Sequence, residues 1–144
     1  LAEPALVLTP PADGAAESTL VADDGLLTAS EVAQLKLDAD WVVLSACNTA
    51  SGDRQGAEAL SGLARAFFYA GARALLVSHW AVDSIAAVKV TTGAFAAMRL
   101  DPTIGRAEAL RRAMLGLIER GALHEAHPTY WAPFMVVGEG AAGR

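Results

Sequence analysis

Two apolar runs, residues 41–44 and 74–77, constrain the fold of this chain more than any other feature. Short apolar runs with aromatic or β-branched members are typical of strands that are buried on both faces. The segment between the runs has apolar residues at helical spacing and then a glycine that can end a helix, namely Leu60, Leu63, Ala64, Phe67 and Gly71. A strand, helix and second strand over this distance require a parallel pair with a right-handed crossover. The sequence therefore predicts that both strands end at the same edge of one sheet.

The only cysteine of the chain follows the first of these strands. Cys47 comes three residues after Leu44 and precedes a glycine-bearing loop. Side chains just past the carboxyl end of a strand emerge at the crevice of an α/β sheet, and loop amides there can face a developing oxyanion. Cys47 is therefore a candidate nucleophile. A small, inert core residue is the alternative that the residues alone leave open.

The pattern before this unit predicts one short strand and one short helix. A strand is predicted at residues 5–8, within an otherwise irregular leading segment over residues 1–19. Thr28 and Glu31 match a capping box, because each side chain can satisfy the other residue's backbone amide. A helix over residues 29–35 should follow, with Val32 and Leu35 facing inward.

The pattern after this unit predicts two longer helices and a last strand. The first helix starts at Asp83 or Ser84, either of which can act as the N-cap, and the second runs from about Arg106 to Gly121. Their inward faces are predicted to contain Ile85, Val88, Phe95 and Met98 in the first helix and Ala107, Leu110, Met114, Leu117 and Ile118 in the second. Residues 133–137 should form the last strand, so the fold class is α/β with at least three core strands and four helices.

The composition excludes several classes of protein. A length of 144 residues suits a single domain, and although 53% of the residues are hydrophobic, no apolar stretch approaches the ~20 residues needed to cross a membrane. A net charge of −5 argues against nucleic acid as a partner. One cysteine allows no internal disulfide, and no secretory signal is visible, which favours a reducing, cytoplasmic location.

Four blocks of sequence resemble the CHAT family. They are residues 44–49 (LSACNT), residues 62–67 (GLARAF) with the Ala-Gly-Ala of 70–72, residues 78–83 (SHWAVD) and residues 127–134 (HPTYWAPF). The likeness covers roughly residues 20–138 in the family's order. It implies a caspase-like three-layer α/β/α fold with a mostly parallel sheet, related to caspases, gingipains and separase. It also implies a cysteine peptidase with a Cys/His dyad, with Cys47 at the nucleophile position and a protein or peptide as substrate.

The position of the histidines departs from the family's pattern. The family's dyad histidine lies in a His-Gly motif upstream of the cysteine, whereas His79, His124 and His127 all follow Cys47. The dyad histidine is therefore expected outside this chain, which we interpret as a partial CHAT-like domain that is inactive alone. The expected partners are the remaining N-terminal part of the domain and repeat domains, because CHAT domains often follow tetratricopeptide repeats.

The resemblance also implies a substrate pocket beside Cys47. Ser45, His79 and Trp80 are predicted to line it, and His79 as a substitute base is the less favoured alternative. Asp83 could bind an arginine or lysine before the cleaved bond, because separase has an aspartate in a similar segment and selects a basic residue. The alternative for Asp83 is a helix N-cap, and the two roles are compatible.

Neither a metal nor a cofactor is predicted. His124 and His127 lack the further ligands of a tetrahedral site, so we interpret them as packing residues. No glycine-rich phosphate loop follows the first clear strand, which argues against a nucleotide-binding domain. The second functional hypothesis is a catalytically inactive, caspase-like interaction module in which Cys47 no longer reacts.

Overall fold

The structure is a computed structural model that describes residues 3–9, 25–44 and 56–142, with only the backbone described for residues 56–61. The elements in chain order are β1 (Ala5–Val7), β2 (Leu26–Thr28), α1 (Ala29–Gln34), β3 (Val42–Val43), α2 (Gly56–Tyr69), β4 (Ala74–Ser78), α3 (Ser84–Leu100), α4 (Arg106–Arg120), η1 (Leu123–Ala126), α5 (Pro128–Trp131) and β5 (Phe134–Gly138). Among these elements, no helix is long and apolar enough to cross a membrane.

The central sheet has the strand order β3-β4-β5. β3 pairs with β4 in parallel, with Val42 opposite Leu75 and Val43 opposite Leu76, so the predicted parallel pair is confirmed. β5 pairs antiparallel to β4, which gives a mixed sheet in the described part of the chain rather than a mostly parallel one. The reason lies in the connection, because α3, α4 and α5 together bring the chain back to the end of the sheet where β4 finishes. The predicted strand at 5–8 is also present, as β1 paired antiparallel to β2.

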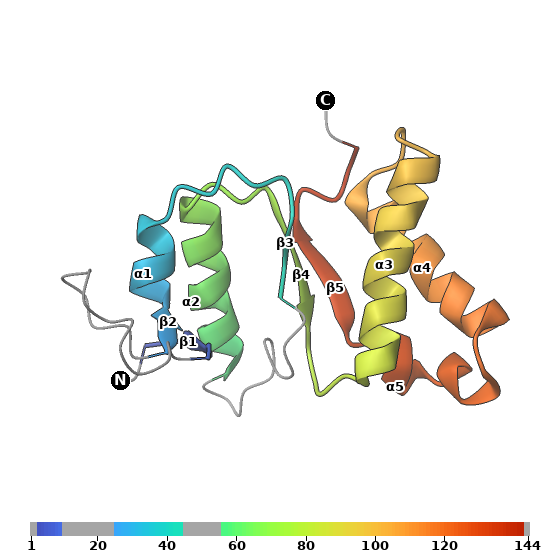
Figure 1. Cartoon of the computed structure of the whole chain (residues 1–144). Coiled ribbons are helices and arrows are strands. Elements are labelled where there is room, and N and C mark those ends of the chain that lie inside the picture. The colour runs from blue at the N-terminus through green and yellow to red at the C-terminus, as the bar shows by residue number, and fades with distance from the viewer. Residues whose placement is uncertain (1–2, 10–24, 45–55, 143–144) are drawn as a thin grey trace.

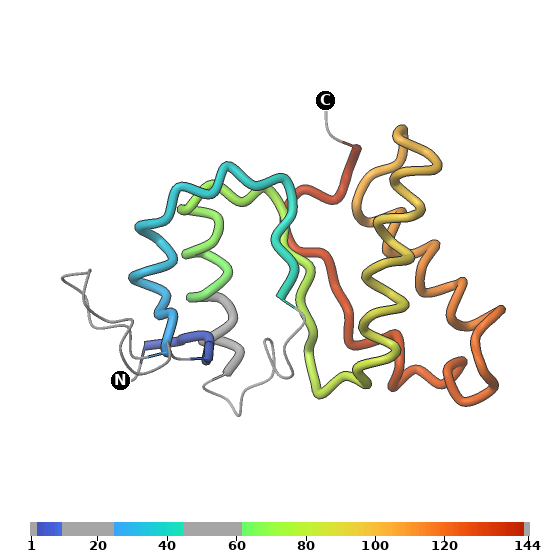
Figure 2. Tube along the Cα trace, in the orientation of Figure 1, coloured from blue at the N-terminus to red at the C-terminus, as the bar shows by residue number. Residues whose placement is uncertain are grey.

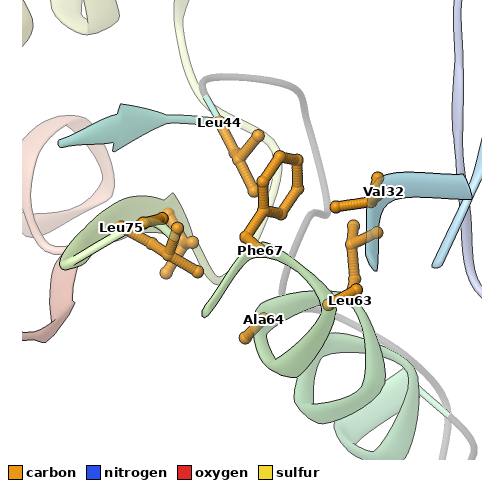
Figure 3. Close-up of a cluster of buried hydrophobic side chains, with 9 residues drawn as sticks. Val32, Leu44, Leu63, Ala64, Phe67 and Leu75 are labelled. Carbon is orange, nitrogen blue, oxygen red and sulfur yellow. The ribbon is translucent and has the colours of Figure 1, made fainter. Parts of the chain in front are cut away.

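Helices cover both faces of this sheet (Figures 1 and 2). α1 and α2 lie on one side, and α3 and α4 lie on the other, so the α/β prediction holds and the elements form three layers. One apolar cluster joins α1 and α2 to the sheet through Val32, Leu63, Phe67 and Leu75 (Figure 3). A second cluster joins α3 and α4 to its opposite face. β4 lies between the two clusters, and all five of its residues are buried.

α1 begins at the predicted capping box. The Thr28 hydroxyl oxygen accepts a hydrogen bond from the Glu31 amide at 3.3 Å, and the Glu31 carboxylate accepts one from the Thr28 amide at 2.8 Å. Val32 is fully buried as predicted, but the prediction for Leu35 is wrong, because Leu35 is exposed. Leu35 follows the last helical residue, and its extended backbone takes its side chain off the inward face.

Replacing Thr28 with alanine should lower the free energy of unfolding by about 1 kcal/mol. The alanine removes the acceptor for the Glu31 amide, and a helix of six residues has little other support for its first turn. Thr28→Ser keeps the hydroxyl and is the matched control. Urea denaturation of both variants checks this, and equal midpoints for alanine and serine would contradict it.

α2 ends as predicted at Gly71, where φ is +100°. A side chain there would also approach the backbone of Asp38, since a Cβ atom would lie 3.1 Å from its nitrogen. This turn is held against the segment before β3 by the Leu37 amide, which donates to the carbonyl of Ala70, and by the Ala39 amide, which donates to Gly71. Glycine at this position therefore fixes how α2 leads into β4 beside β3.

The predicted inward face of α3 is wrong for three of its four residues. Ile85, Val88 and Phe95 are 64%, 61% and 47% exposed, whereas Met98 is half-buried and the buried residues of the helix are small or β-branched, namely Ala86, Ala87, Val90 and Ala94. The cause is the close approach of α4, since a Cβ atom on Gly93 would lie only 3.2 Å from that of Ala113. Packing at this distance selects small side chains and leaves the large ones outside.

Two charged side chains are buried at the ends of the α3–α4 layer. Arg106, at the start of α4, donates to the Glu139 carbonyl at 3.2 Å and lies 3.5 Å from the Asp40 carboxylate. Glu125, in η1, accepts from the Lys89 ammonium at 2.6 Å and from the Ala122 amide at 2.7 Å. The Lys89 contact, followed by the amide contact, holds the pKa of Glu125 below its usual value.

Candidate functional site

The candidate site lies where β3 and β4 end at one edge of the sheet. The Leu44 amide donates to the Leu76 carbonyl at 2.8 Å, which extends the parallel pairing past the end of β3. Parallel strands finish at the same edge, and the chain leaves β4 there through residues 79–83 toward α3 (Figure 1). The prediction that the two strands end side by side is therefore confirmed.

Ser45 and Cys47 lie outside the described residues. Leu44, which immediately precedes them, is buried between β4 and α2 in the cluster of Figure 3. The structure therefore fixes the strand from which the cysteine segment departs. The prediction that Cys47 faces a pocket stays a prediction.

Residues 78–80 form the exit from β4. Ser78 is fully buried in the last pair of the antiparallel ladder, opposite Phe134. The His79 amide then donates to the Pro133 carbonyl at 3.0 Å, so the backbone is fixed as it leaves the sheet. The His79 side chain is half-buried, and that of Trp80 is exposed. Two predicted pocket residues thus lie together at the end of β4, and one of them has an accessible aromatic ring.

Asp83 is the N-cap of α3. Its Oδ1 atom accepts a hydrogen bond from the Ala86 amide at 2.9 Å, and its backbone is extended, as the N-cap position requires. The residue is exposed, and within the described part of the chain its second carboxylate oxygen has no hydrogen-bond or ion-pair partner. The N-cap interpretation is confirmed, and this geometry leaves an oxygen on Asp83 that can meet a cationic group.

The two remaining histidines lie away from β3, near α5. The His127 Nδ1 atom accepts from the Thr129 amide at 3.3 Å and caps α5, and the ring of His124 meets Tyr130 edge-on with centroids 5.2 Å apart. Among the described residues, no group of three or more metal-ligating side chains occurs. His124 and His127 have structural contacts, as the sequence predicted.

Trp41 has a feature that the sequence did not reveal. Its ring packs on Phe95 of α3 with centroids 5.0 Å apart. Its Nε1 atom is buried and has no hydrogen-bond acceptor in the described part of the chain. An unpaired, buried N–H group costs free energy, so an acceptor from elsewhere would be stabilising there. The sequence predicts only that Trp41 is a strand residue, because no pattern indicates which side of a strand is left open.

The chain matches a known protein family. Residues 1–139 match the CHAT domain, so the chain belongs to the CHAT-domain family. It is also 38% identical over 113 residues to tetratricopeptide repeat protein 28 of mouse and, to the same extent, to that of human. The match covers 78% of this chain and 4% of each relative, so the chain spans a small part of these relatives. No solved structure matches the chain.

Proposed function

We propose that this chain is the cysteine-bearing part of a CHAT-type cysteine endopeptidase. The observation that carries the proposal is the parallel pairing of β3 with β4 in a chain of the CHAT family. This pairing brings the segment that leads to Cys47 and the exit segment with His79, Trp80 and Asp83 to one edge of the sheet. The carboxyl edge of such a sheet is where α/β proteins hold their ligands.

The proposed reaction proceeds through an acyl-enzyme. The Cys47 thiolate attacks the carbonyl carbon of a peptide bond, the carbon–nitrogen bond breaks, and the amine leaves with a proton from the imidazolium of the dyad. Water then hydrolyses the thioester and restores the thiol. The dyad histidine comes from outside this chain, while Ser45, His79 and Trp80 line the pocket for the residue before the cleaved bond.

Asp83 selects a basic side chain in this proposal. Its Oδ1 atom is engaged as the cap of α3, so the carboxylate is held in place while the other oxygen can meet a guanidinium group. A cap that fixes the carboxylate reduces the entropy lost on binding. The capping role and the binding role therefore support each other.

Replacing Asp83 with asparagine should reduce the preference for arginine over norleucine at the cleaved position by about 10- to 100-fold, because a hydrogen bond to a charged group is lost. Asparagine is as good an N-cap as aspartate, so the stability should stay within about 0.5 kcal/mol. Asp83→Ala should lose the same preference and, in addition, about 1 kcal/mol of stability. Peptide cleavage rates and thermal melts of both variants check this, and an unchanged preference in Asp83→Asn would contradict the assignment.

The experiment that tests the proposed function is covalent labelling of the full-length protein. The probe is a thiol-reactive peptide with arginine at the position before the reactive group. We expect rapid, stoichiometric labelling, with the adduct found on Cys47 by mass spectrometry of the digested protein. Absence of labelling would favour the inactive interaction module instead.

We also propose that the rest of the domain adds a strand beside β3. In the parallel ladder the backbone groups of Val42 and Leu44 face β4, so those of Val43 face the other side, where the described residues place no strand. Trp41, whose Nε1–H group is unpaired among the described residues, immediately precedes β3 and packs on the partly exposed ring of Phe95. Such a strand would pair with the backbone groups of Val43, cover the ring of Phe95 with apolar side chains and offer a carbonyl to the Trp41 Nε1–H group.

The relatives support the proposal of a repeat-domain context. Both are named as tetratricopeptide repeat proteins, and the matched segment is a small part of each. We propose that repeat domains in the parent protein of this chain control access of the substrate to the site.

A further inference from the structure

A groove separates α3 from α4 on the outer side of their layer. It has a volume of about 490 Å³ and is lined mostly by apolar atoms of small residues, among them Gly93, Ala97 and Ala113. The small side chains let the two helices lie close together, since a Cβ atom on Gly93 would lie 3.2 Å from that of Ala113. The groove lies on the side of α3 that faces α4, away from the open edge of β3 and the candidate peptidase site.

The charged residues at the rim of this groove are all basic. Lys89, Arg112 and Arg120 line it, and no aspartate or glutamate does. The surrounding stretch, residues 84–126, has six basic and four acidic residues, whereas the whole chain has a net charge of −5. The α3–α4 layer is therefore the basic part of an acidic protein.

Arg120 is the basic residue most open to a new partner. Lys89 is already bound by Glu125, and Arg112 is bound by Glu108 at 2.8 Å and by Asp101 at 3.2 Å. Within the described part of the chain, no carboxylate lies within 4 Å of Arg120. Its guanidinium group lies over Gly116, where a Cβ atom would approach it to 2.9 Å, so the charge is held at the wall of the groove.

We propose that this groove binds an amphipathic helix whose apolar stripe is flanked by carboxylates. Leucine-sized side chains would fill the apolar floor between α3 and α4, and a carboxylate at the flank would form a paired contact with Arg120. A helix fits because the groove follows the two helices, and α3 is 17 residues long, which corresponds to about 25 Å. The occupant is thus an acidic helical segment of a protein partner, and its binding does not depend on the chemistry of Cys47.

The test is a binding titration with the full-length protein. The probe is a fluorescein-labelled 18-residue peptide with leucine at intervals of three and four residues and glutamate at the flanking positions, and the control peptide has lysine in place of each glutamate. We expect saturable binding of the glutamate peptide that weakens as NaCl concentration rises, and at least about tenfold weaker binding of the lysine peptide. Equal binding of the two peptides, or preferential binding of duplex DNA of the same length, would overturn the proposal.

Three variants locate the binding. Arg120→Glu reverses the free charge, and Ala97→Trp fills the groove, so each should weaken binding of the glutamate peptide by at least about tenfold. Arg111→Glu is the matched control, because Arg111 is on the same helix, does not line the groove and undergoes the same change of charge. It should change the affinity less than about threefold. Circular dichroism melts show whether each variant is folded. If Ala97→Trp is unfolded, the test depends on comparing Arg120→Glu with Arg111→Glu. Equal weakening of peptide binding in these two variants would contradict binding at the groove.

Discussion

Replacing Cys47 with alanine in the full-length protein is expected to abolish both labelling and peptide cleavage. Loss of a nucleophile removes the covalent route entirely, and the rate should fall by about 10⁴-fold or more, to the background of the assay. Alanine is about as small as cysteine, so the fold should persist. The loss of activity should therefore come from a lower catalytic rate and not from unfolding. Steady-state cleavage of an arginine peptide and mass spectrometry of the labelled protein measure the two effects.

Two further variants make this result interpretable. Cys47→Ser keeps a hydroxyl in the same position but lacks a thiolate at neutral pH, so it should be as inactive as the alanine variant. His79→Ala should reduce kcat/KM only modestly, by about tenfold, because His79 is assigned to the pocket and not to the dyad. Labelling of the alanine variant as fast as the wild type would refute the peptidase proposal, and a loss in His79→Ala equal to that in Cys47→Ala would show that His79 is the base.

Replacing Leu75 with alanine is expected to have the largest effect on stability. Leu75 is fully buried in β4, and Leu44, Phe67 and Leu63 belong to the same cluster on the α2 side of the sheet (Figure 3). Its removal leaves a cavity between α2 and β4 that neither element can close without breaking the ladders to β3 and β5. We expect the free energy of unfolding to fall by about 3 kcal/mol, within the range of 2–5 kcal/mol for such sites.

The matched control is Leu123→Ala. Leu123 is fully exposed in η1, so the same change of side chain there should alter the free energy by less than about 0.5 kcal/mol. Chemical denaturation of both variants, with equal slopes, measures the difference. A Leu75→Ala protein as stable as Leu123→Ala would mean that β4 is not at the centre of the core.

The sequence predicted those parts of the fold that depend on local patterns. The capping box of Thr28, the stop at Gly71 and the N-cap at Asp83 follow from residues close together in the chain, and all three are present. The β3–β4 pair joins residues 33 positions apart, but it follows from the strand–helix–strand order and is present too. Within α4, Glu108 contacts Arg111 at 2.7 Å and Arg112, one turn later, at 2.8 Å. The hydrogen bond from Arg111, followed by that from Arg112, lowers the pKa of Glu108 to about 2.

Features that depend on distant contacts were not predicted. α3 is apolar on most of its surface, so the sequence pattern favoured the larger side chains as its buried face. In the structure the short distance between α3 and α4 instead places alanines at the buried positions. The pair of buried Glu125 with Lys89 joins residues 36 positions apart, and Arg106 contacts Asp40, which lies 66 positions earlier in the chain. The antiparallel direction of β5 could not be predicted either, because it depends on the path of three helices.

For the candidate site, the sequence predicted which segments lie close together but not the contacts that their side chains make. The sequence placed His79, Trp80 and Asp83 beside the strand that leads to Cys47, since parallel strands share an edge. It could not predict the orphan N–H of Trp41 or the basic rim of the α3–α4 groove, because both result from which surfaces are left uncovered when the helices pack.

The antiparallel direction of β5 has a practical consequence for labelling this protein. Gly138 lies opposite Ala74, the first residue of β4, whereas Phe134 lies opposite Ser78, the last. The chain after β5 therefore leaves at the far end of the sheet from His79 and Asp83, roughly 13 Å along four strand residues. An affinity tag or fluorophore attached after Ala142 would therefore lie far from the edge where substrate is proposed to bind. Immobilisation through that tag would leave this edge exposed to solution.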